Sequence, residues 1–364
     1  MVARSERVRS GLLVAALVAV VACETPQRIA APIATPSEAT AVPTSSTASP
    51  SAGAVTRAAA PVTFAFAGDV NFEGVLDYQL RHEPASILEP VAATLRQADI
   101  AMVNLETAVT TRGVRARKDY AFRAPVAAFD ALRAGGVDVV TLANNHGLDY
   151  GRVGLADTLA AARVARLPLV GAGRNAAEAY AGWRTVVRGT RVTVVGASHV
   201  LDYKLARDWT AGPDKSGLAS AYAETLLLER IRRARRDSDI VVVYVHWGSE
   251  LVGCPTRAQR RLGAALVGAG ADVVVGSHAH VLLGTGHVGH AVVSYGLGNF
   301  AFGSAGRRTA QTGVLVVTVD GRRVGYRFEP AVIVRGVPHP LRAAIATRAR
   351  RAWLQLRACT DLAP

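Results

Sequence analysis

Six short polar clusters, each at the end of an apolar run, carry the residues of this chain that could do chemistry. The runs and clusters read FAFAGDVNF, AMVNLET, VVTLANNHGLDYG, VVVYVHWGSE, VVVGSHAHV and VVSYGLGNF. The clusters contribute carboxylates, carboxamides and imidazoles, at Asp69, Glu106, Asn144, Asn145, His146, His246, His278 and His280. These three groups together are the ligands from which hydrolytic metal centres are built. The residue types therefore predict a metal site.

The runs before the clusters have the β-branched composition of buried strands. In α/β folds, ligands bind just beyond the carboxyl ends of parallel strands, where the loops converge. Six loops that follow six such strands are therefore expected to meet at one rim.

Two of the clusters are the most informative. On a strand continuing from VVVG, alternation would point the rings of His278 and His280 to one side, at a separation suited to neighbouring metal positions. The alternative is two solvent-exposed loop histidines. In NNH, two carboxamides and an imidazole in a row make poor strand or helix material. Asp69 and Glu106 each have a plainer interpretation, as a turn cap and a surface acid.

The elements that position these clusters alternate regularly along the chain. Strands are expected at Val62–Ala67, Ile100–Val103, Val137–Leu142, Leu169–Val170, Thr185–Val187, Val192–Val195, Ile240–Val245, Asp272–Val275, Ala291–Tyr295, Val314–Val319 and Val324–Phe328. Helices are expected at Ser86–Ala98, after Pro125 as far as Gly135, and at Arg152–Ala165, Ala219–Arg236 and Arg257–Val267. Ser86 and Glu89 have the spacing of a capping box. Repeated β-α-β followed by a strand-rich end predicts an α/β domain on two sheets.

The N-terminus has the features of an export signal. Arginines precede the apolar run GLLVAALVAVVA, which ends at Cys23 and is too short for an ordinary spanning helix. The sequence VVAC is similar to the bacterial lipobox, which predicts lipidation of Cys23; plain cleavage or an uncleaved anchor are the alternatives. Residues 1–23 are thus expected to be a signal peptide, 24–60 an Ala/Pro/Ser/Thr-rich disordered linker, 61–335 the globular domain and 336–364 a basic helical tail.

The net charge of +14 comes mainly from arginine, with clusters at Arg230–Arg236 and Arg342–Arg357. A positive field favours anionic partners such as lipid headgroups, wall polymers or a capsule chain, although the first cluster also reads as a solvated helix face. Nucleic acid is excluded as a partner by export and by the absence of a recognition motif.

Cys254 and Cys359 are the two cysteines of the exported part, and they are expected either to pair or to remain free thiols.

The ordered motifs GDVNF, NLET, KDYAFRAP, LANNHGLDYG, HWGSE, GSHAHV and YGLGNF, from about Val62 to Phe302, resemble those of the bacterial capsule-synthesis CapA family. That family is linked to poly-γ-glutamate capsule production and is similar to the calcineurin-like metallophosphoesterases. The resemblance implies a four-layer αββα sandwich with its site at the rim of the sheets. It also implies one or two divalent metal ions (Mn, Zn or Fe).

The resemblance further implies a role for each residue. Asp69 and His280 are expected at the first metal, Asn145, His246 and His278 at the second, and Glu106 between them, with His146 as the catalytic acid. Two departures stand out: Asn71 occupies the position where the enzymes usually have histidine, and Glu106 replaces the usual aspartate. Substrate-binding or supporting roles are expected for Asn71, Asn144, Lys118, Arg123 and Asn299. Surface solvation is the alternative for Lys118 and Arg123, and a turn role for Asn299.

Three functions remain open from the sequence. The first is a surface-anchored, metal-dependent hydrolase or transferase that acts on an anionic capsule or envelope polymer at the extracytoplasmic face of the membrane. The second is a non-catalytic export or assembly factor that binds such a polymer, in a complex with other capsule-synthesis subunits. The third is a secreted metallophosphodiesterase. Fold analogy alone does not choose among them.

Overall fold

The computed structural model describes residues 60–202, 204–303 and 306–364. The expected signal peptide, Cys23 and nearly all of the expected linker lie outside these residues. Residues Arg57–Pro364 form one compact unit. Among the described residues, no helix has both the length and the apolar character needed to cross a membrane.

The larger of two main sheets has the order β18-β17-β16-β1-β2-β5-β6, and β15 also pairs with β1. Its strands are β1 (Val62–Val70), β2 (Ile100–Leu105), β5 (Val139–Thr141), β6 (Leu169–Val170), β15 (Asn299–Ala301), β16 (Gln311–Asp320), β17 (Arg323–Val334) and β18 (Val337–Pro340). Strands β1, β2, β5 and β6 run parallel, while β16 to β18 are antiparallel. The parallel half therefore gathers the carboxyl ends of its strands at one edge.

The second sheet has the order β13-β14-β12-β11-β9-β8. Its strands are β8 (Trp183–Val187), β9 (Thr190–Ser198), β11 (Ile240–His246), β12 (Val273–Ser277), β13 (Thr285–Val288) and β14 (Ala291–Ser294). Its central strands β9, β11, β12 and β14 are parallel. Two small sheets pair β3 (Ala108–Val109) with β4 (Arg123–Ala124), and β7 (Ala172–Gly173) with β10 (Gly217–Leu218).

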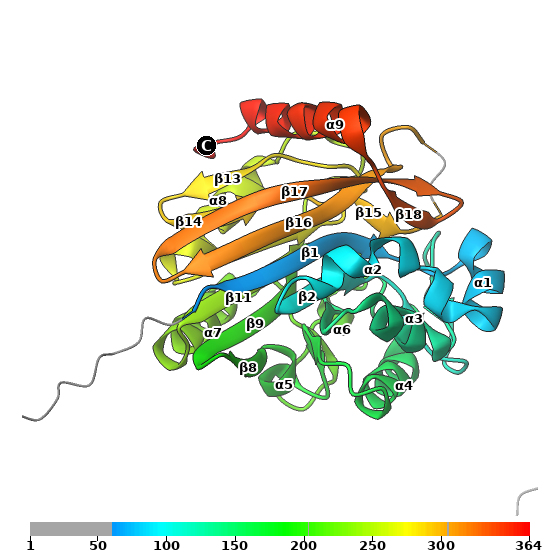
Figure 1. The fold of residues 1–364 in the computed structure, drawn as a ribbon. Helices are drawn as coiled ribbons and strands as arrows, with labels where there is room; N and C mark the ends of the chain where they lie inside the picture. The colour runs from blue at the N-terminus through cyan, green and yellow to red at the C-terminus, as the bar shows by residue number, and fades with distance from the viewer. Residues whose placement is uncertain (1–59, 203, 304–305) are drawn as a thin grey trace, which may run out of the picture. The chain divides into compact units, whose positions relative to one another are not determined.

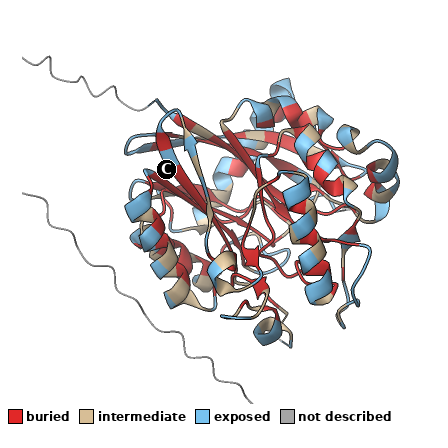
Figure 2. Cartoon of the chain, turned by 90° about the horizontal axis from the view of Figure 1, so that it is seen from below, coloured by how far each residue is buried: buried red, intermediate tan, exposed pale blue. Residues whose placement is uncertain are grey.

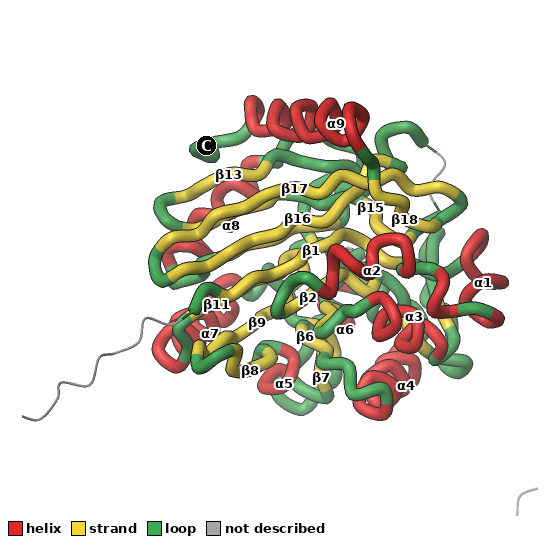
Figure 3. Tube along the Cα trace, in the orientation of Figure 1, coloured by secondary structure: helices red, strands yellow, loops and turns green. Residues whose placement is uncertain are grey.

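The α-helices lie on the outer sides of the sheets (Figures 1 and 3). They are α1 (Asp77–His82), α2 (Glu89–Arg96), α3 (Ala127–Gly135), α4 (Gly151–Val164), α5 (Ala176–Ala179), α6 (Ala206–Trp209), α7 (Glu224–Asp237), α8 (Arg257–Gly268) and α9 (Ala343–Gln355). Single 3-10 turns occur at Gly74–Leu76, Pro84–Ser86 and Leu356–Cys359.

Three apolar cores separate the layers. One lies between α1–α4 and the larger sheet, one between the second sheet and α7 and α8, and the third between the two sheets. Figure 2 shows the buried strands in the middle and the exposed surfaces of the helices outside them. This arrangement confirms the expected four-layer αββα sandwich.

Two local predictions were wrong. The capping box expected at Ser86 and Glu89 is absent, because the Ser86 hydroxyl donates to the Glu83 carbonyl and α2 begins only at Glu89. Helix α7 begins at Glu224 and not at Ala219, because Ser220 forms a bridge with Ser198 and hydrogen bonds with the Tyr180 hydroxyl. In both places tertiary contacts override the local helical signal.

The C-terminal segment was expected as a basic helix, either packed on the domain or lying against a membrane, and in the structure it packs on the domain. Strand β18 pairs with β17, and α9 packs on β17 (Figure 1). Trp353 of α9 stacks on Phe328 with ring centroids 4.6 Å apart and contributes to the core between the sheets. The basic helix therefore closes one side of the sandwich.

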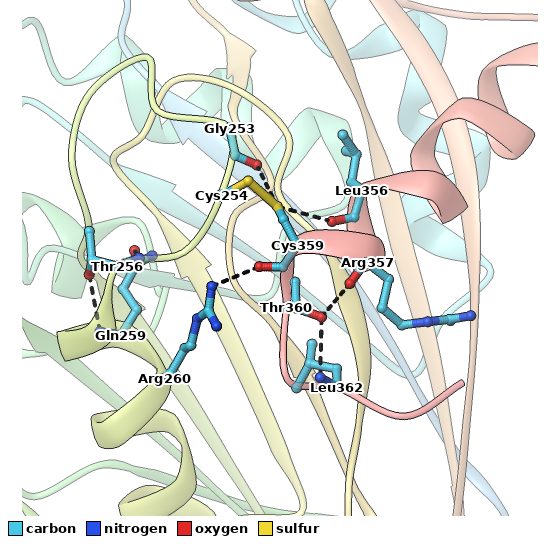
Figure 4. The surroundings of a disulfide bond; sticks show 10 residues. All are labelled: Gly253, Cys254, Thr256, Gln259, Arg260, Leu356, Arg357, Cys359, Thr360 and Leu362. Carbon is cyan, nitrogen blue, oxygen red and sulfur yellow. Dashed lines mark hydrogen bonds between the residues drawn. A yellow bond between two sulfur atoms is a disulfide. The ribbon is translucent and has the colours of Figure 1, made fainter.

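A disulfide bond joins Cys254 to Cys359, which settles the two alternatives left by the sequence in favour of pairing (Figure 4). Their Cα atoms are 5.7 Å apart and the sequence separation is 105. Closing a loop of this length stabilises the folded state by on the order of 4 kcal/mol in the chain-entropy model. Cys254 follows β11, so the bond ties a loop near the strand ends to the C-terminus.

Candidate metal centre

Hydrogen bonds across and between the sheets bring the carboxyl ends of their strands together. Asp69, near the end of β1, is paired in register with Asn104 of β2 and with Asn299 of β15. In the other sheet, His246 at the end of β11 is paired with Ser277 at the end of β12. The next residue, His278, donates its backbone N–H to Asp69 Oδ2 at 3.1 Å. This hydrogen bond joins the two sheets at the rim that carries the polar clusters.

His278 and His280 do come together, but not by strand alternation as expected. Strand β12 ends at Ser277, and both histidines lie in the following turn with positive φ, 94° and 55° respectively. Their ring centroids are 5.9 Å apart. Ligand atoms of Glu106, His278 and His280 all lie within 4.8 Å of one another. A non-glycine residue at positive φ is uncommon, and such strain clusters at functional sites.

Asn145 and His246 complete the same cluster. His246 Nε2 lies 2.7 Å from Asn145 Oδ1 and 3.3 Å from Glu106 Oε1. The ring of His246 is 4.7 Å from that of His278, centroid to centroid. The structure thus brings together all six of the expected ligands, including Asp69.

Glu106 is the least satisfied residue of the cluster. Its side chain is fully buried, yet neither carboxylate oxygen has a hydrogen-bond donor among the described residues, and the same holds for Nδ1 of the buried His278. A buried carboxylate without a donor is rare and costs several kcal/mol. Burial raises the pKa of Glu106, although nearby His280, His146 and Lys118 act in the opposite direction. These orphaned atoms fit a bound cation.

Two of the imidazoles in the cluster have pKa values that suit metal ligation, whereas burial and neighbouring charges raise the pKa of the other titratable groups. Burial, with the charge of Glu106 added, raises the pKa of Asp69. Burial lowers the pKa of His246 to about 3 and that of His278 well below its ordinary value. Burial acts to lower the pKa of His280 as well, but the carboxylates of Glu106 and Asp69 outweigh it and raise that pKa. His246 and His278 are therefore neutral at neutral pH, which is the form that binds metal.

Carboxamides orient these ligands. Asn299 Oδ1 lies 2.8 Å from His280 Nδ1, an arrangement in which Nδ1 carries the proton and Nε2 is left with its lone pair. Asn144 Nδ2 donates to Asn104 Oδ1 at 2.9 Å, and Asn104 Nδ2 donates to Asp69 Oδ1 at 2.8 Å. Asn104 was not among the expected residues. The sequence did contain an indication of its role: Asn104 is a polar residue inside the apolar strand AMVNL, where a carboxamide adds nothing to apolar packing.

His146 stands beside the cluster in a dyad that sequence reasoning missed. Its Nδ1 lies 2.6 Å from Asp149 Oδ2, and its ring stacks on Phe122 at 4.1 Å. Lys118 Nζ lies 3.1 Å from Asp149 Oδ1 and 2.8 Å from Asp202 Oδ2, and donates to the Asn145 carbonyl. Lys118, whose side chain is 9% exposed, therefore compensates the charge of Asp149. Asp149 was visible in LDYG, three residues after His146.

Two expected residues make other contacts. Asn71 Oδ1 accepts a hydrogen bond of 2.9 Å from the backbone N–H of Glu73, in a local turn. The exposed Arg123 places its guanidinium 4.8 Å from the ring centre of Tyr150, and its backbone N–H donates to Glu73. Among the described residues, neither side chain forms a hydrogen bond or ion pair with the six clustered residues.

Residues 63–304 match the model of a protein family described as "Bacterial capsule synthesis protein PGA_cap". The matched segment contains the whole cluster and every residue that orients it. The chain belongs to this family. The PGA_cap match ends before β16, so α9 and the disulfide partner Cys359 lie outside it.

Two curated relatives are similar over most of this PGA_cap chain. The "Capsule biosynthesis protein CapA" of Bacillus anthracis is 31% identical over 278 residues, which are 74% of this chain. The chain spans only 64% of that relative's length. The "PGA biosynthesis protein CapA" of Bacillus subtilis (strain 168) is 30% identical over 76% of this chain and 73% of its own length. Among solved structures, a Mycoplasma pneumoniae phosphatase aligns with a TM-score of 0.49 and 16% identity, covering 75% of this chain and 94% of its own.

Proposed function

We propose that this chain is a surface-anchored, metal-dependent hydrolase or transferase that acts on an anionic capsule or envelope polymer of the poly-γ-glutamate type. Family membership and the names of the two CapA relatives support the polymer. The observation that carries the enzymatic part is Glu106, a fully buried carboxylate without a donor among the described residues. One ligand atom from each of Glu106, His278 and His280 lies within 4.8 Å of the other two, close enough to bind the same ion.

The residues present fit a divalent cation such as Mn²⁺, Zn²⁺ or Fe²⁺. Glu106 with Asn145, His246 and His278 would hold one ion, and Glu106 with Asp69 and His280 would hold a second. When bound, such an ion supplies a Lewis acid and lowers the pKa of bound water. Imidazole and carboxylate together are a donor set for these metals.

His146 is proposed to handle the proton of the leaving group. The contact of Nδ1 with Asp149 fixes the tautomer and the ring plane, and leaves Nε2 as the atom that exchanges a proton with substrate. The ring is held from the side by Phe122. His146 directly follows Asn145, whose side-chain oxygen lies 2.7 Å from His246 Nε2. The proton donor thus adjoins the proposed metal position.

A non-catalytic polymer-binding factor is the second candidate, favoured by one observation. The resemblance to metallophosphoesterases implies a histidine where this chain has Asn71, and the side-chain Oδ1 of Asn71 already accepts a hydrogen bond from the N–H of Glu73. A site that lacks this ligand holds its first ion weakly, because a neutral carboxamide is a poorer donor than imidazole. Assays with two substrates separate the candidates. The hydrolase should cleave poly-γ-glutamate, a secreted phosphodiesterase should cleave bis-p-nitrophenyl phosphate, and the binding factor should cleave neither.

Metal content tests the proposed centre. His246→Ala should remove nearly all bound metal, because it deletes an imidazole next to Glu106, whereas Asp69→Ala should retain part of it. His82→Ala, in the exposed last turn of α1, is the control and should bind metal like the parent. Elemental analysis after saturation with Mn²⁺ or Zn²⁺ gives the occupancy. Full occupancy in His246→Ala, or none in the parent protein, would contradict the assignment and favour the binding factor.

Anchoring through Cys23 is part of the proposal and rests on the lipobox-like VVAC. In a bacterial host, Cys23→Ala should move the protein from the membrane fraction to the soluble fraction. Mass spectrometry of the N-terminal peptide should show an acyl modification in the parent protein. An unmodified Cys23 peptide from the membrane fraction would rule lipid anchoring out.

A further inference from the structure

A groove of about 360 Å³ lies between α9 and the neighbouring strands β16 and β17, on the side of the sandwich that α9 closes (Figure 1). The helix contributes an apolar stripe at positions i, i+4, i+7 and i+11, made of Ile345, Ala349, Ala352 and Leu356. The sheet contributes Phe328, Pro330 and Val332. Both walls are therefore apolar, as in pockets that bury hydrocarbon.

The groove is open to solvent and not a packing defect inside the core. Ile345, at one end of the stripe, is 59% exposed although it is large and apolar. Trp353, one residue from the stripe, also lines the groove and is buried against Phe328. Its indole N–H has no acceptor in the part of the chain that the structure describes. A buried donor without a partner is uncommon, and here it belongs to a groove wall.

Most of the arginines beside the groove have no ion-pair partner among the described residues. The segment from Leu341 to Arg357 contains five arginines and no acidic residue. Arg350 pairs with Glu329, and Arg357 donates to the Tyr326 hydroxyl. The other three, Arg342, Arg348 and Arg351, are exposed and have no ion-pair partner among the described residues.

Helical geometry places two of these charges next to the apolar stripe. Arg348 follows Ile345 by three positions and precedes Ala352 by four, so it lies on the same side of the helix as both. Arg351 follows Arg348 by three positions and continues the charged border towards solvent. An apolar groove bordered by unpaired guanidinium groups matches a hydrocarbon chain with an anionic head.

We propose that this groove binds an acyl chain of an anionic phospholipid in a membrane, with Arg348 and Arg351 bound to its phosphate. Arginine pairs well with phosphate, and anionic surfaces attract basic helices. A polycarboxylate would use the arginines but leave the apolar stripe exposed, so lipid fits the whole surface better. This edge of the domain would then rest on the membrane, and the inference does not depend on the metal centre.

Helix α7 provides a matched comparison. Its Arg232, Arg233 and Arg236 are exposed and, like those of α9, have no ion-pair partner among the described residues. No large exposed apolar residue interrupts them on that helix. Arg232→Gln/Arg233→Gln thus removes the same charge as Arg348→Gln/Arg351→Gln, but from a groove of about 390 Å³ whose lining, apart from Leu226, is charged.

The test uses residues Arg57–Pro364, the compact unit that contains all three cores, and therefore omits the expected leader and Cys23. Co-sedimentation is measured with vesicles of phosphatidylcholine alone and with phosphatidylglycerol added. Binding is expected only with phosphatidylglycerol. Arg348→Gln/Arg351→Gln should weaken it about thirtyfold, and Ile345→Ser should weaken it at unchanged charge. The α7 variant should bind like the parent protein.

Lipids with brominated acyl chains test insertion directly, because bromine quenches nearby tryptophan. Quenching should be seen in the parent domain and should disappear in Trp353→Phe, which keeps the stack on Phe328. The proposal is overturned by a lack of vesicle binding, by equal losses in the α7 and α9 variants, or by binding without quenching. A dimer in sedimentation velocity that Ile345→Ser disperses would also overturn it, since a second copy would then cover the groove.

Discussion

Replacing His146 with alanine is expected to lower kcat by about 10²- to 10⁴-fold, the usual contribution of a positioned acid or base. Bound metal should remain, because His146 contacts Asp149 through Nδ1 and stacks on Phe122, and it is not one of the six expected ligands. The measurement is steady-state turnover on the substrate that the parent protein accepts, with metal content determined on the same sample. Unchanged turnover would remove His146 from the mechanism.

Asp149→Asn separates orientation of His146 from its chemistry. The variant keeps the shape of the side chain but removes the charge that fixes the imidazole, so kcat should fall less than in His146→Ala. The pH dependence of kcat should shift while KM changes little. Arg112→Gln, which loses an exposed ion pair with Asp157 outside the site, is the control and should leave both constants unchanged. A fall in folded fraction with an unshifted pH profile would assign Asp149 a structural role only.

Replacing Glu106 with glutamine is expected to stabilise the metal-free protein and to abolish stabilisation by metal. The substitution removes a buried carboxylate without a donor, whose cost is about 1–3 kcal/mol or more, and supplies an amide that can donate to His278 Nδ1. The parent protein should gain about 2.7 kcal/mol at a metal concentration of 100 times Kd, and the variant nothing. Urea unfolding with and without Mn²⁺ gives both values.

The pH dependence of this effect has a definite sign. A carboxyl whose folded pKa is raised contributes stability fully below its ordinary value, 4.5 for Glu106, and that contribution is lost as pH rises through the raised pKa. The advantage of Glu106→Gln over the metal-free parent should therefore grow from acid to neutral pH. Asp69→Asn is the contrasting variant, since Asp69 already accepts from Asn104 and from the N–H of His278. It should destabilise, and a similar gain in both variants would contradict the orphaned-carboxylate interpretation.

Much of the fold and of the site could be predicted because it depends on local patterns. Apolar runs gave the positions of the central strands, as with Val62–Ala67 inside β1 and Ile240–Val245 inside β11. Parallel strands bring their carboxyl ends to one edge, so polar residues at those ends had to converge. The convergence of the six expected ligand residues could therefore be predicted without knowing any contact.

What could not be predicted depends on tertiary geometry. The turn that orients His278 and His280 needs positive φ at both residues, which no pattern of side chains indicates. Lys118 is charged and near the site, but only its distances to Asp149 and Asp202 show that it supports His146. The sequence could not decide whether the basic helix packs on the domain or lies against a membrane, because nothing in it indicates that Trp353 would pack on Phe328.

The pairing of β1 has a consequence for how the protein acquires its structure. Its parallel neighbour β2 follows soon in the chain, whereas its antiparallel neighbour β16 comes near the other end, with Val62 opposite Val319. Such distant contacts slow folding, since the loop entropy is lost before the strands pair. Until β16 arrives, one edge of β1 is an unpaired apolar template for other chains. A fragment that stops at residue 304, where the family match ends, should therefore aggregate. During synthesis, a chaperone that shields β1 would be needed until β16 has been made and has paired with it.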